Sequence, residues 1–169
     1  MLQFTLNVCR LRDGPQNAPN SQILLALLVF AYLLIASLAY SSLDTQVAPL
    51  LPALQGLLIS LFGTVLLLHL TRRPERFHQT AITLLASSCL LSLVDSGLDS
   101  LIAATGEASP SFLVIAWLAL FMWSFVIDAH IYRHSLEISF THAMLIAVCL
   151  FSINQFILIS WYVPLVNIQ

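Results

Sequence analysis

Residues 22–42, QILLALLVFAYLLIASLAYSS, form an unbroken apolar run that decides the class of the fold. A helix needs about 20 such residues to cross the roughly 30 Å hydrocarbon core of a bilayer. Ser21 stands directly before the run, where its hydroxyl can cap the first helical turn. The stretch therefore predicts a transmembrane helix.

Four further apolar runs follow, at about residues 50–70, 78–98, 111–131 and 142–163. The chain is 59% hydrophobic and 8% charged with a mean hydropathy of +0.93, which excludes a water-soluble domain of this size. The joints between the runs are short, so chain neighbours are expected to pack as antiparallel hairpins. We predict an all-α fold in which residues 22–169 form one domain of five transmembrane helices.

The first run has a rival interpretation as a secretory signal peptide. Arg10 and Arg12 precede it, and Ser37-Leu38-Ala39 is similar to a small-residue cleavage site. The apolar run is long for a signal peptide, which favours a helix that stays in the membrane.

Residues 1–21 are predicted to form an N-terminal segment outside the bilayer. Leu2, Leu6 and Cys9 recur at helical spacing, so a short interfacial helix fits this stretch. Gly14 and Pro15 prevent that helix from running directly into the first span.

The arginines predict the orientation of the bundle. Under the predicted spans all six lie on one side, at positions 10, 12, 72, 73, 76 and 133, and the chain has no lysine. Because basic residues favour the cytoplasmic side, we expect a cytoplasmic N-terminus and a periplasmic or outside C-terminus. The lack of a basic surface excludes a nucleic-acid partner, which leaves the lipid bilayer and other membrane proteins or a second copy.

Histidines near the predicted cytoplasmic interface supply a candidate metal site. His130 and His134 are four positions apart and therefore share a helix face, with Asp128 and Glu137 close by. The alternative is that these imidazoles simply lie at the headgroup boundary. The cysteines lack a C-x-x-C pair, so we expect no disulfide and no zinc site built from sulfur, and no cofactor other than this metal ion.

Asp95 and Asp99 form the second candidate site, for an ion or a proton. They also share a helix face, and counting from Thr80 at about 1.5 Å per residue places Asp95 in the outer quarter of the bilayer. No basic residue of this chain is predicted there, so a proton, water, a metal ion or a partner's cation must compensate them. The alternative is that both carboxylates lie at the membrane rim and reach water.

Small and amide side chains are candidates for helix packing. Gly56 and Ser60 form a small-xxx-small pair with Gly63 beyond it, which lets helix backbones approach closely. Asn154 and Gln155 fall near the predicted bilayer centre, where amides commonly bond to a neighbouring helix.

Residues 12–21, RDGPQNAPNS, resemble the Arg-x-Gly-Pro-Gln-x-x-Pro-x-Ser segment of a group of small uncharacterised bacterial inner-membrane proteins. The five spans and cytoplasmic N-terminus are also similar to the Yip1 superfamily. This resemblance implies the inner (plasma) membrane and a role in membrane organisation or trafficking.

Three functions remain open. The chain lacks G-x-S-x-G, P-loop, H-E-x-x-H and dinucleotide motifs, which favours a non-enzymatic accessory or assembly component or membrane organiser. The second hypothesis is a small cation- or proton-coupled transporter or channel that uses Asp95 and Asp99. A metal-dependent membrane enzyme using His130, His134 and Glu137 is the third.

Overall fold

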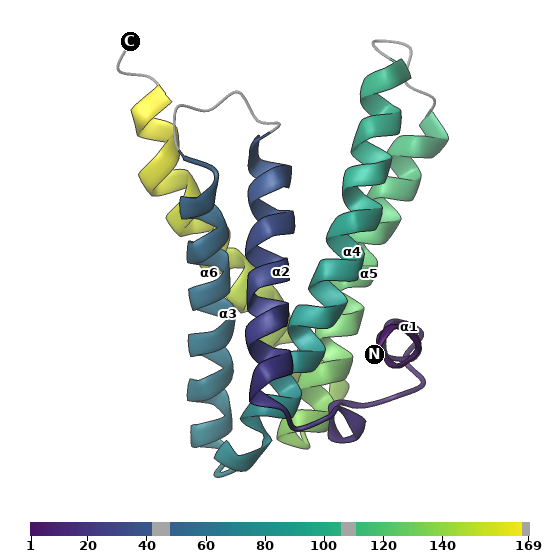
Figure 1. Cartoon of the computed structure of the whole chain (residues 1–169). Helices are drawn as coiled ribbons and strands as arrows, with labels where there is room; N and C mark the ends of the chain where they lie inside the picture. Colours follow the sequence, from purple (N-terminus) through teal and green to yellow (C-terminus); the bar gives the residue numbers. More distant parts are fainter. Residues whose placement is uncertain (42–47, 106–110, 167–169) are drawn as a thin grey trace.

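A computed structural model of the chain describes residues 1–41, 48–105 and 111–166, with side chains up to residue 160 (Figure 1). Every regular element in this part of the chain is helical, so the all-α prediction is confirmed. The elements are α1 (Leu2–Cys9), η1 (Pro15–Asn17), α2 (Gln22–Ser41), α3 (Leu50–Leu70), η2 (Pro74–Arg76), α4 (Phe77–Thr105), α5 (Ser111–Leu136) and α6 (Phe140–Val166).

Five of the described helices, α2 to α6, are long and apolar enough to cross a membrane. This confirms the prediction of five candidate transmembrane helices. Three helices are longer than predicted. α4 ends at Thr105 instead of residue 98, α5 ends at Leu136 instead of residue 131, and α6 covers Phe140–Val166 instead of 142–163. In α4 the hydroxyls of Ser96 and Ser100 each donate to the carbonyl four residues earlier, at 2.8 Å, so these polar side chains find acceptors within their own helix.

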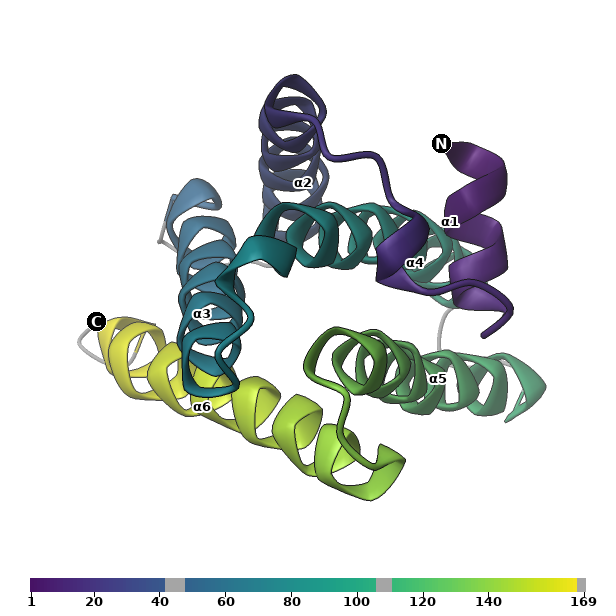
Figure 2. The same cartoon turned by 90° about the horizontal axis from the view of Figure 1, so that it is seen from below.

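The five long helices form a closed ring when viewed along the bundle (Figure 2). The order around the ring is α2, α4, α5, α6 and α3, and each helix packs against the next. Successive helices run in opposite directions (Figure 1). Three chain-neighbour pairs are therefore antiparallel hairpins as expected, whereas α3 packs mainly against α2 and α6 and only weakly against α4.

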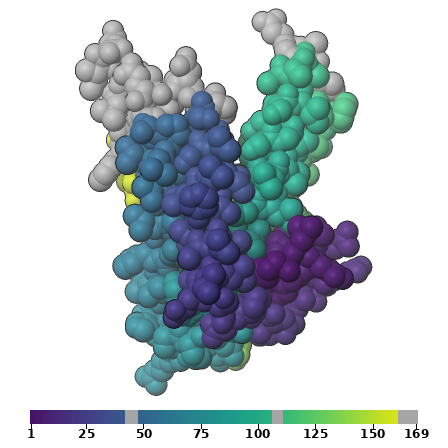
Figure 3. All heavy atoms as spheres, in the orientation of Figure 1, coloured from purple at the N-terminus to yellow at the C-terminus, as the bar shows by residue number. Residues whose placement is uncertain are grey.

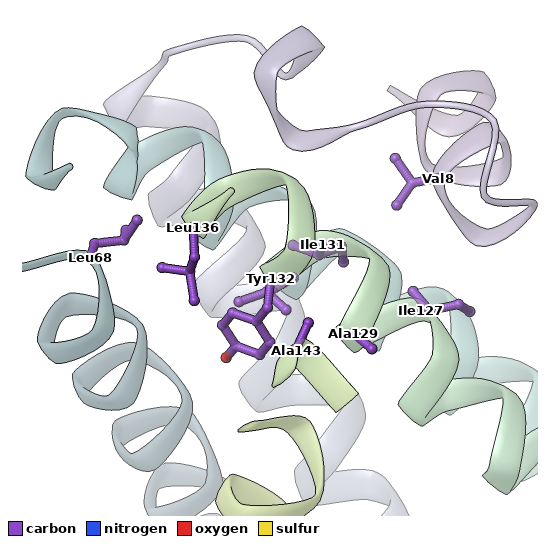
Figure 4. Close-up of a cluster of buried hydrophobic side chains, with 9 residues drawn as sticks. Val8, Leu68, Ile127, Ala129, Ile131, Tyr132, Leu136 and Ala143 are labelled. Atoms are coloured by element: carbon purple, nitrogen blue, oxygen red, sulfur yellow. The ribbon is translucent and has the colours of Figure 1, made fainter. Parts of the chain in front are cut away.

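The tightly packed part of the bundle lies at one end, where the α3–α4 and α5–α6 connections meet. We call it the arginine end because Arg72, Arg73 and Arg76 lie in the first of these connections and Arg133 lies in the last turn of α5. A buried apolar cluster joins these elements, with Leu68, Ile131, Tyr132, Leu136 and Ala143 among its members (Figure 4). Toward the opposite end, α4 and α5 lean away from α2 and α3, and the surface is hollowed between them (Figures 1 and 3). The fold is thus closed at one end and splayed at the other.

The N-terminal segment packs against α4 and α5 near the arginine end. Val8 of α1 is fully buried, and the indole N–H of Trp123 donates to the Cys9 carbonyl at 3.1 Å. The His130 ring lies 2.9 Å from the Asp13 carbonyl, through Nε2. These contacts attach the segment to the bundle at two places along α5.

Candidate functional site

A cavity of about 170 Å³ lies inside the ring and is the main candidate for a functional site. All five long helices line it. Its polar side chains are Tyr32 from α2, Ser60 from α3, Ser88 from α4, Asp128 and Tyr132 from α5, and Asn154 from α6. Leucines, Ala147 and Phe151 form much of the remaining wall.

A second cavity of about 260 Å³ adjoins the first. The two cavities share Tyr32, Ser88 and Asp128, so these three side chains form their common wall. From there the second cavity runs along α4 past Ser92 to Asp95. Together the two spaces connect two carboxylates on different helices through a polar wall.

Asp128 occupies the centre of this arrangement. It lies eight residues before the end of α5 at Leu136, which is about 12 Å along the helix axis. The residues on either side of it in the chain, Ile127 and Ala129, are fully buried in the packed core, while Asp128 lines both cavities. Neither cavity is lined by an arginine or a histidine, and no described residue forms a hydrogen bond or ion pair with Asp128.

The hydroxyl of Tyr132 is oriented by α3. It lies 3.3 Å from the Thr64 hydroxyl, which itself donates to the Ser60 carbonyl at 2.7 Å. Because the Thr64 hydrogen is used in that bond, Tyr132 is the donor to Thr64 and keeps its own lone pairs free to accept. This chain of bonds fixes one polar wall of the first cavity.

The amide of Asn154 and the glycine at position 56 lie opposite each other across the α3–α6 contact. The Gln55 side chain donates to the Asn154 backbone carbonyl at 3.0 Å and to its side-chain oxygen at 3.3 Å. A Cβ at Gly56 would stand 3.0 Å from the Tyr32 hydroxyl. The lack of a side chain at Gly56 therefore leaves room for Tyr32 at the cavity wall.

The other packing candidates lie along the same interface. A Cβ at Gly63 would meet the side chain of Leu150 at 2.7 Å, so this glycine permits the close approach of α6. Ser60 lines the first cavity, and Gln155 is partly buried on α6. The small-residue motif thus serves both helix contact and cavity space.

Asp95 and Asp99 have different surroundings despite their shared spacing. Asp95 is partly buried and lines the second cavity. Asp99, one turn further along α4, is exposed and lines neither cavity. Of the hydroxyls along α4, Ser88 and Ser92 line the cavities, while Thr83 and Ser87 are buried and bond to their own helix.

The candidate metal ligands are only partly brought together. The rings of His130 and His134 have centroids 4.6 Å apart, and His130 contacts the Asp13 carbonyl. Glu137 instead forms ion pairs with Arg73 and Arg76. Within residues 1–41, 48–105 and 111–166, no three His, Cys, Asp or Glu side chains are grouped so that they could hold a metal ion.

Sequence reasoning did not identify Asp128 and Tyr32 as members of one site. A signal was present, because Asp128 is a lone acid about two turns inside an apolar span, and such an acid is costly unless it faces the bundle interior. What the sequence did not supply was the ring order that places α2 beside α4 and so brings Tyr32 toward α5.

Comparison of the chain with protein-family models, with curated proteins and with solved structures finds no match.

Proposed function

We propose that this protein is a small membrane transporter that binds a cation or a proton in the central cavity, with Asp128 and Asp95 as the acceptors. The observation that carries the proposal is the position of Asp128, in a cavity lined by all five long helices and without a basic partner among the described residues. An intramembrane acid is costly, and such residues commonly mark ion or proton pathways.

The charge of the site supports a positive ligand. No side chain that lines either cavity carries a positive charge, and two of them are carboxylic acids. A bound cation or a proton compensates a carboxylate that has no counterion of its own. The charge of the lining side chains therefore favours a positively charged ligand.

The shape of the bundle supports transport over simple binding. Asp128 lies about 12 Å from the arginine end of α5, whereas Asp95 lies ten residues, or about 15 Å, from the opposite end of α4. The two adjoining cavities thus contain carboxylates at two different depths along the bundle. At the splayed end α4 and α5 stand apart from α2 and α3, whereas the arginine end is closed by the packed core (Figure 1).

Flux measurements on purified protein in liposomes test this proposal. We expect cation-dependent or proton flux with wild type, and a fall of at least about tenfold in Asp128→Asn, because the amide keeps the shape and removes the charge. Asp95→Asn should also lower the flux. Asp99→Asn is the matched control, since Asp99 is on the same helix but lines no cavity, and it should keep wild-type flux.

Two results would overturn the proposal. One is wild-type flux that does not exceed that of empty liposomes for protons and a panel of alkali and organic cations. The other is unchanged flux in both Asp128→Asn and Asp95→Asn.

An accessory or assembly role is the competing proposal, and the lateral face of α2 favours it. Ala36 is the only buried residue of this helix, and Ile23, Leu27, Phe30, Leu34 and Leu38 form an exposed apolar stripe at helical spacing. Such a stripe fits lipid or a partner helix. Isolation in mild detergent tests the role, since a monomer without stoichiometric partners contradicts it.

The proposed setting is the inner (plasma) membrane with the arginine end in the cytoplasm. The clustering of Arg72, Arg73 and Arg133 at the α3–α4 and α5–α6 connections supports this orientation. Reporter fusions after residue 75 and at the C-terminus should report opposite compartments, and a common compartment contradicts the orientation.

A further inference from the structure

We infer that the ligand of the central cavity is a small organic ammonium ion rather than a metal cation. This inference rests on the proposed function and specifies the chemical class of its substrate. The feature behind it is the combination, in the first cavity, of a single acid with aromatic rings and aliphatic walls.

The acid supplies one point of charge in the first cavity. Among the described residues, Asp128 is the only carboxylate that lines this cavity, and Asp95 lies at the far part of the second. One carboxylate in a site lined by apolar carbon fits a cation whose charge is shielded by its own alkyl groups. Such an ion loses less hydration on entering the cavity than a compact cation does.

Aromatic rings line the same two cavities as the acid. Tyr32, Tyr132 and Phe151 line the first cavity, and Phe121 lines the second. Phe121 and Phe151 hold each other in an edge-to-face arrangement, with ring centroids 5.5 Å apart. Aromatic residues attract alkylammonium groups by cation–π interaction, and the combination of rings with an acid is a recognised means of binding choline-like ligands.

The same walls suit a metal cation poorly. Calcium takes six to eight oxygen ligands, and magnesium needs near-octahedral oxygen coordination. The first cavity offers one carboxylate and scattered hydroxyls, and the amide oxygen of Asn154 already accepts from Gln55. No group of three acidic, histidine or cysteine side chains exists in the described chain to strengthen such coordination.

Binding of choline to the purified full-length protein in nanodiscs tests the inference. Equilibrium dialysis with radiolabelled choline should show saturable binding, and Asp128→Asn should weaken it by at least about 30-fold, as expected when one partner of an enclosed charge pair is removed. The neutral carbon isostere 3,3-dimethylbutanol should not compete, because it has the shape of choline without the charge. Asp99→Asn should bind as wild type does.

A second pair of variants examines the aromatic wall without touching the acid. Phe151→Leu should weaken choline binding by about 3- to 30-fold, which is the range of a cation–π contact. Phe156→Leu is the matched control, since Phe156 is on the same helix but is 72% exposed and lines no cavity. Equal binding by the two phenylalanine variants contradicts a role for the rings.

The outcomes distinguish a failure of this inference from a failure of the proposed transport function. If choline does not bind while Asp128-dependent flux of protons or alkali cations persists, the ammonium class is wrong and the transporter stands. If choline does not bind and no flux is found, both are wrong. Competition by 3,3-dimethylbutanol as effective as that by unlabelled choline also overturns the inference, because it shows that charge is not recognised.

Discussion

The guanidinium of Arg76 lies 2.8 Å from the carboxylate of Glu137, and this contact joins the α3–α4 connection to the α5–α6 connection. Arg73 forms a second ion pair with the same carboxylate. Arg76 also donates to the His134 carbonyl near the end of α5, at 3.2 Å. Two connections that are far apart in the sequence are therefore tied together at the arginine end, where the bundle is closed.

The Glu137 ion pairs predict a specific dependence of stability on pH. The hydrogen bonds from Arg73 and Arg76 lower the pKa of Glu137 to about 2, from a usual value near 4.3. A carboxyl with a lowered pKa stabilises the fold fully above its unfolded pKa and loses that effect as pH falls through its folded pKa. The difference in Tm between wild type and Glu137→Gln should thus be constant above about pH 5 and shrink toward pH 2.

That comparison has an internal control. Other acids contribute equally to both proteins, so they cancel in the difference. A Tm difference that stays constant down to pH 2, or that grows as the pH falls, contradicts the ion pairs.

The close approach of α3 and α6 predicts different effects of enlarging two glycines. Gly63→Leu should destabilise the fold by about 1–3 kcal/mol, because the new side chain meets Leu150. Gly97→Leu is the control, since a Cβ at Gly97 meets nothing within 4 Å. Unfolding followed by tryptophan fluorescence in detergent measures both, and Leu150→Ala should partly restore Gly63→Leu. Equal costs at the two glycines contradict the close contact.

The Gln55–Asn154 contact predicts a measurable coupling between α3 and α6. A double-mutant cycle with Gln55→Ala and Asn154→Ala should give a coupling energy of about 0.6 kcal/mol, which reports the bond to the Asn154 side-chain oxygen because Asn154→Ala keeps the backbone carbonyl. The same cycle with Gln155→Ala in place of Asn154→Ala should give a coupling near zero. A coupling that is equal in both cycles means that Asn154 is not the specific partner.

The docking of α1 predicts slow modification of Cys9. Burial raises the pKa of this thiol, so less of it is the reactive thiolate at a given pH. In a background with Cys89→Ala and Cys149→Ala, maleimide labelling should be slow and should accelerate by about tenfold or more in Trp123→Phe, which removes the bond to the Cys9 carbonyl. Trp117→Phe serves as the control, and equal rates in both tryptophan variants contradict the docking.

The spans were predictable because hydropathy and length are local properties of the chain. Residues 50–70 were placed correctly at both ends, whereas the end of α4 was placed too early because Asp95 and Asp99 indicate a membrane rim. The helix continues past both residues, and the hydroxyls of its serines donate to carbonyls of the same helix. Short-range patterns therefore determined the elements and misplaced only some ends.

The site was less accessible to prediction because it depends on contacts between helices that are distant in the sequence. Spacing alone paired Asp95 with Asp99, but packing separates them, with Asp95 at the cavity and Asp99 exposed. Asp128 was grouped with the nearby histidines, yet it faces the cavity while His130 contacts the N-terminal segment. The direction in which each residue points follows from the ring order of the helices, which no single helix encodes.

Access of water to Asp128 tests the central claim most directly. In a cysteine-free background, Asp128→Cys should react readily with a small cationic methanethiosulfonate reagent. Cys89 restored alone is the buried comparison and should react far more slowly. If the thiol introduced by Asp128→Cys is as unreactive as Cys89, the cavity is sealed from solution and does not serve as a cation site.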